Sequence, residues 1–65
     1  LFAEIAELSQ HLGRKVRVQA VGADVREGIL AEVQPAAIVI ERRYAGGAMT
    51  VRVPVEQIRQ VEVRF

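Results

Sequence analysis

The spacing of apolar residues changes once along this chain, from a helical period to a strand period. The apolar positions at the start recur at intervals of three or four residues: Leu1, Phe2, Ile5, Leu8 and Leu12. This spacing predicts an amphipathic helix over about residues 1–12, with Gly13 as its C-terminal cap. Beyond Gly13, apolar and polar residues alternate, which is typical of half-buried strands.

Turn residues divide the remainder of the chain into strands, expected at about 15–21, 25–33, 37–44, 48–53 and 59–65. Gly28 lies inside the second of them, where a glycine allows a bulge or a sharp bend. In that strand the alternation places Val25, Ile29, Ala31 and Val33 on one face. Residues 54–57 are too few for an α-helix and predict a 3₁₀ turn. Strongly bent strands in so short a chain favour a mainly β fold, in which the N-terminal helix precedes a five-stranded antiparallel barrel.

Length and composition limit the function classes. At 65 residues the chain has room for a single domain over 1–65, and association between copies would supplement its small core. The net charge of +1 indicates no bulk attraction to nucleic acid or to acidic membranes, and the absence of cysteine excludes disulfides. Without a transmembrane-length run or a signal peptide, a cytoplasmic location is expected, and the start at Leu1 leaves room for residues upstream.

Three segments carry a resemblance to a known family: residues 12–18 (LGRKVRV), 28–30 (GIL) and 51–58 (VRVPVEQI). They resemble the Sm-like (LSm/Hfq) small β-barrel family over essentially the whole chain. Other SH3-like barrels share this pattern, including the C-terminal domain of the RimP ribosome maturation factor.

The resemblance implies a ring of six or seven copies, in which the fourth strand of one subunit pairs with the fifth strand of the next. The interface would then use residues of these two strands: Met49, Val51, Val53, Val61, Val63 and Phe65. Proline at Gln60 or Glu62 is expected to remove a donor of this ladder and to break the ring.

The family's RNA-reading positions are not well matched. Eukaryotic and archaeal members have an Asp and an Asn around the turn between strands two and three, where this chain has Gln34 and Ala37. The family's Arg-Gly after strand four falls on Pro54 and Val55, and the Lys-His pair of Hfq is absent too. Gln34 remains able to hydrogen-bond a base edge, but uridine recognition at the pore is not expected.

Two basic clusters are the remaining candidates for RNA contact. The first comprises Arg14, Lys15 and Arg17. The second comprises Arg42, Arg43 and Tyr44, in which the aromatic ring offers a stacking surface. Basic strand faces are commonly plain solubility features, and that interpretation stays open.

Nothing in the sequence predicts an enzyme. His11 is the single histidine, near the expected helix end, and no nucleophile, base and orienting group can be assembled. No cofactor, metal, membrane or small-molecule substrate is expected. The predicted function is a ring-forming Sm-like scaffold that binds RNA through phosphate contacts with little sequence preference. The alternative is a protein-interaction or ribosome-assembly module built on an SH3-like barrel.

Overall fold

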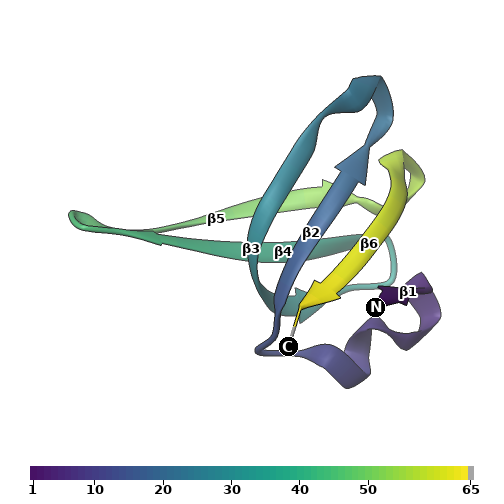
Figure 1. The fold of residues 1–65 in the computed structure, drawn as a ribbon, viewed down its shortest axis with the longest axis horizontal. Helices are drawn as coiled ribbons and strands as arrows, with labels where there is room; N and C mark the ends of the chain where they lie inside the picture. Colours follow the sequence, from purple (N-terminus) through teal and green to yellow (C-terminus); the bar gives the residue numbers. More distant parts are fainter. Residues whose placement is uncertain (65) are drawn as a thin grey trace.

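The chain folds into one strongly curved antiparallel sheet, with short 3₁₀ segments between strands (Figure 1). A computed structural model describes residues 1–64, apart from the side chain of Ala23. Its strands are β1 (Phe2–Ala3), β2 (Lys15–Ala20), β3 (Val25–Val33), β4 (Ala37–Tyr44), β5 (Gly47–Pro54) and β6 (Ile58–Arg64). The 3₁₀ segments are η1 (Ile5–His11), η2 (Val21–Ala23) and η3 (Val55–Gln57).

The strands follow the order β1-β6-β2-β3-β4-β5, so β1 and β5 form the two edges of an open sheet. The mainly β fold is therefore confirmed, and the five predicted strands correspond to β2 through β6. The pairing adds β1 as a sixth strand and does not join the two edges into a closed barrel.

The predicted helix over residues 1–12 is wrong. Residues 2–3 form β1, and only Ile5–His11 is helical, with the Glu7 N–H donating to the Glu4 carbonyl at 2.9 Å in the i to i+3 pattern of a 3₁₀ helix. So short a helix is marginal by itself, whereas the edge of β6 offers the first residues backbone partners. Of the predicted apolar stripe, Leu8 is fully buried, while Leu1 and Phe2 are each 64% exposed.

The core lies between the inner face of the sheet and η1. On β2 the prediction holds, because Val16, Val18 and Ala20 are buried and alternate with polar residues. The buried cluster draws on all the longer strands and on η1: Leu8, Val16, Val18, Leu30, Ile38, Ile40, Val53, Val61 and Val63. Strands β2 through β6 therefore enclose a single apolar core with η1.

The inner face of β3 does not follow simple alternation. Pairing with β4 shifts register between Leu30 and Glu32, which is a β-bulge at Ala31. Leu30 consequently lies in the core, whereas Ala31 and Val25 are exposed. The residues predicted to share one face of this strand therefore do not all do so, because Val33 packs against the core beyond the bulge.

Gly28 lies where β4 packs closely against β3. A Cβ at Gly28 would lie 2.6 Å from the Glu41 carbonyl oxygen and 2.6 Å from Cγ2 of Ile40. No side chain fits at those distances, so a glycine is required here for steric reasons. The predicted bulge or bend lies at Ala31 rather than at Gly28, because the β3–β4 register shifts there.

The β4–β5 hairpin projects from the body of the fold as a two-stranded arm (Figure 1). Its strands are joined through the turn at Ala45 and Gly46. Near the tip, Tyr44 is 58% and Met49 is 50% exposed, so the outer part of the arm lies beyond the core.

Candidate functional site

The outer edge of β5 presents backbone groups that β4 does not use. The two strands pair in register from Ala37↔Pro54 to Tyr44↔Gly47, and the Val55 N–H donates to the Ala36 carbonyl at 2.9 Å. The Ala36–Val55 pair is hydrogen-bonded, and bonded and non-bonded pairs alternate along an antiparallel ladder. The pairs at even-numbered residues of β5 are therefore non-bonded. The residues whose amide groups face away from β4 are therefore Ala48, Thr50 and Arg52.

The second exposed edge belongs to β6, and β1 covers part of it. On this side Phe2 pairs with Glu62 and Ala3 with Val61, while β2 occupies the other side. The Val63 N–H donates to the Leu1 carbonyl at 2.6 Å, and the Leu1 amino group donates to the Val63 carbonyl at 3.3 Å.

By the same alternation, the amide groups of Val61 and Val63 face β1, and those of Gln60 and Glu62 face β2. Proline at Gln60 or Glu62 would therefore disrupt the sheet within one chain. These two positions therefore do not distinguish pairing between copies from pairing within the chain.

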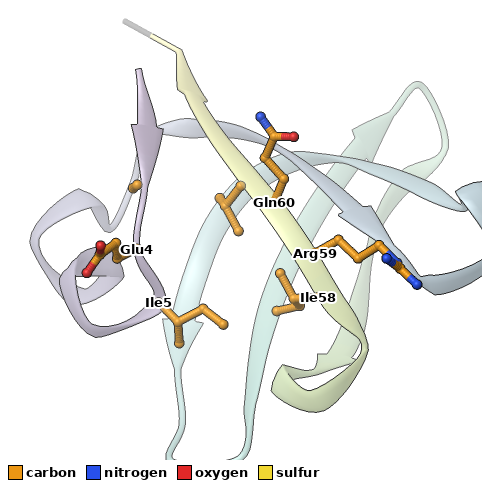
Figure 2. A pocket seen from close by; sticks show the side chains of 7 residues that line it. Glu4, Ile5, Ile58, Arg59 and Gln60 are labelled. Carbon is orange, nitrogen blue, oxygen red and sulfur yellow. The ribbon is translucent and has the colours of Figure 1, made fainter.

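Beyond β1 the edge of β6 opens into a hollow of about 320 Å³. After Ala3 the chain turns away into η1, and a gap opens between Ile5 and Ile58, while the Glu4 side chain points away from β6 (Figure 2). Ile5 and Ile58 lie on opposite sides of this gap, so two apolar side chains flank the hollow where it continues the line of β1 (Figure 2).

The predicted interface residues differ in exposure. Met49 is 50% exposed and Val51 is half-buried. Three others lie in the chain's own core with 4%, 2% and 1% of their surface exposed: Val53, Val61 and Val63. These three would offer a neighbouring copy backbone groups rather than side chains, and Phe65 lies outside the described residues.

Residues from the two predicted basic clusters meet at one surface hollow of about 300 Å³. Lys15 of the first cluster and Arg42 and Arg43 of the second line it, together with Glu27, Gly28, Ile29 and Glu41. These cations share one hollow because β3, which lies between β2 and β4, carries Gly28 rather than a larger residue at this place. We call this feature the basic hollow.

Acidic side chains compensate much of this charge. Lys15 Nζ lies 4.0 Å from Glu27 Oε1, and Arg43 Nε lies 2.7 Å from Glu41 Oε1. Among the described residues, Arg42 has no ion-pair partner. Three cations and two carboxylates therefore leave the basic hollow with a single excess positive charge.

The other predicted RNA-binding residues lie elsewhere. Arg17 is not part of the basic hollow and pairs in register with Glu27 on one side and Glu62 on the other. Arg14 precedes β2, and Tyr44 lies at the exposed tip of the arm. Arg17 therefore lies beside two acidic residues, and neither Arg14 nor Tyr44 lines the basic hollow.

The positions that correspond to the family's RNA-reading residues surround a different hollow, of about 350 Å³. Its walls are mostly apolar and carry one acid: Pro35, Ala36, Val55 and Glu56. Gln34 accepts a hydrogen bond from Arg52 Nε at 3.5 Å, and Ala37 is completely buried. A hollow of this composition offers phosphate little attraction.

The described residues contain no group of three or more His, Cys, Asp or Glu side chains that could hold a metal ion. Within residues 1–64, no helix has the length and apolar character needed to cross a membrane. No family model, curated protein or solved structure matches this chain. The sheet edges and the basic hollow are the features that suggest function.

Proposed function

We propose that this protein is a self-associating scaffold of the Sm-like kind, in which β5 of one copy pairs with β6 of the next. The observation that carries the proposal is the free β5 edge together with the partly uncovered β6 edge, on two different strands of one curved sheet. A contact between two different edges is heterologous, and it forms a ring when its rotation closes. The close packing of β4 against Gly28 and the bulge at Ala31 support a barrel of the Sm-like type.

The proposed ligand of this scaffold is RNA, held through its phosphates. Lys15, Arg42 and Arg43 gather at the basic hollow, where Arg42 is the cation without an ionic partner among the described residues. One excess charge per copy binds phosphate weakly. Repetition around a ring raises the overall avidity without new contacts.

RNA binding is expected to be weak, nearly indifferent to base identity and steeply salt-dependent, because neutralised phosphates release counterions. Labelled oligo-U and oligo-A titrated at about 50 mM and 200 mM salt measure all three properties. Arg42→Ala should weaken both titrations to the same extent, while Arg26→Ala, which removes a cation already paired with Asp24 at 2.9 Å, serves as the control. Tight, salt-insensitive and uridine-selective binding would contradict phosphate contact as the mode of recognition.

A protein-interaction module is the second candidate. It is favoured by the compensation of Lys15 and Arg43 by acids and by the apolar hollow beside β6. An extended peptide can add to an exposed edge as a further strand, with main-chain hydrogen bonds providing affinity. A monomeric mass in light scattering, together with no RNA binding at low salt, would select this candidate over the scaffold.

A further inference from the structure

We propose that β1 is a displaceable cap on the β6 edge, so that β1 and the β5 strand of a neighbouring copy compete for the same backbone groups. This inference rests on the proposed self-association and adds its regulation. The contested groups are the N–H and C=O of Val61 and Val63, which face β1 within the single chain.

The geometry makes the two states exclusive. An antiparallel strand uses each edge for one partner, and β2 already occupies the other edge of β6 along residues 58–64. A neighbouring β5 can reach the uncovered part of the edge at the hollow beside Ile58. It can extend along β6 to Val63 only after β1 has left.

The cap is held weakly. β1 comprises two residues, and the side chains of Leu1 and Phe2 each remain 64% exposed. Ala3 alone packs partly against the core, so departure of β1 exposes little apolar surface. The principal loss is a few edge hydrogen bonds, which an incoming strand can replace.

The incoming strand has suitable spacing. The outward amide groups of Ala48, Thr50 and Arg52 recur every second residue, as do those of Val61 and Val63 on β6. Pro54 follows in the same series, where its missing N–H limits the donors of the β5 edge. β5 therefore offers a longer ladder than β1 does.

A disulfide between β1 and β6 provides the first test. Phe2 and Glu62 are register partners on the outer face, and by alternation they form a non-hydrogen-bonded pair, whose short Cα separation suits a disulfide. The chain has no cysteine, so Phe2→Cys combined with Glu62→Cys introduces the only thiols. We expect the reduced form to associate as the wild type does. The oxidised form, with β1 locked on β6, should associate at least about tenfold more weakly.

The opposite test releases the cap. Ala3→Pro removes an amide donor that faces β6, whereas Phe2→Pro changes a position whose amide faces away and serves as the matched control. We expect Ala3→Pro, and not Phe2→Pro, to strengthen association about tenfold, because more molecules present an open edge. In dilute protein, the amides of Val61 and Val63 should lose hydrogen-exchange protection in Ala3→Pro, while that of Glu62 keeps it.

The outcomes separate the cap from the assembly itself. Equal association of the oxidised and reduced cysteine variants would overturn the cap and leave the scaffold standing. The cap would also be overturned if the Val61 amide of Ala3→Pro kept its wild-type hydrogen-exchange protection in both dilute and assembled protein. No association of any variant, measured by light scattering, would overturn the proposed scaffold and with it the competition.

Discussion

Replacing Gly28 with alanine is expected to destabilise the protein by about 1–3 kcal/mol, as overpacking of a close contact does. The added Cβ would meet the Glu41 carbonyl oxygen and Ile40 Cγ2, both at 2.6 Å. The carbonyl belongs to the backbone of a paired strand and cannot rotate away, so β3 and β4 must separate. Gly28→Val adds two more methyl groups at the same place and should cost at least as much.

Thermal unfolding at low protein concentration measures this effect. For a domain of this size each kcal/mol lowers Tm by about 4–8 °C, and the whole free energy of unfolding is roughly 3–10 kcal/mol. Gly46→Ala is the matched control, since its Cβ would meet only ring atoms of Tyr44 at 3.5 Å. Equal melting temperatures for Gly28→Ala and Gly46→Ala would show that the close approach of β3 and β4 is absent in solution.

Replacing Thr50 with proline is expected to abolish assembly and leave the monomer folded. The Thr50 amide faces away from β4, so proline there removes a donor from the free edge and no hydrogen bond from the β4–β5 ladder. Light scattering should give the wild type as a multiple of 7.2 kDa and Thr50→Pro as the monomer. A mass six or seven times that of the chain corresponds to the proposed ring.

Two controls isolate the role of the amide group. Thr50→Ala removes the same side chain and retains the donor, so it should assemble as the wild type does. Met49→Pro removes an amide that faces β4 and should lower thermal stability, because it breaks the internal ladder. A folded Thr50→Pro with the mass of the wild-type assembly would refute pairing through the β5 edge.

Local pattern was sufficient to locate most of the strands. The bounds of β3 and β4 agree with the predicted 25–33 and 37–44, because Gly22, Pro35 and Gly46 separate runs of strand-forming residues. The alternation of Val16 and Val18 with charged neighbours likewise predicts the buried face of β2. These features depend on neighbours in sequence, which is why the sequence alone determined them.

Long-range contacts decided the N-terminal segment and the inner face of β3. Leu1, Phe2 and Ile5 have helical spacing, but residues 2–3 form a strand instead. They do so because they pair with the edge of β6, which lies nearly sixty residues away in sequence. The bulge at Ala31 likewise arises from pairing with β4, and it turns Leu30 rather than Ala31 into the core. Periodicity within one segment carries no information on either pairing.

For the candidate sites too, the sequence determined some features and the tertiary structure decided others. The sequence indicated which residues are basic and that the last two long strands had apolar alternation. Only the tertiary structure placed Lys15 beside Arg42 and Arg43, paired two of these cations with acids, and buried Val61 and Val63 in the core. It also decided which amides face outward, since that depends on the register of each strand with its neighbour. Residue type is a property of the sequence, whereas proximity, charge compensation and edge exposure follow from the way the sheet curves and pairs.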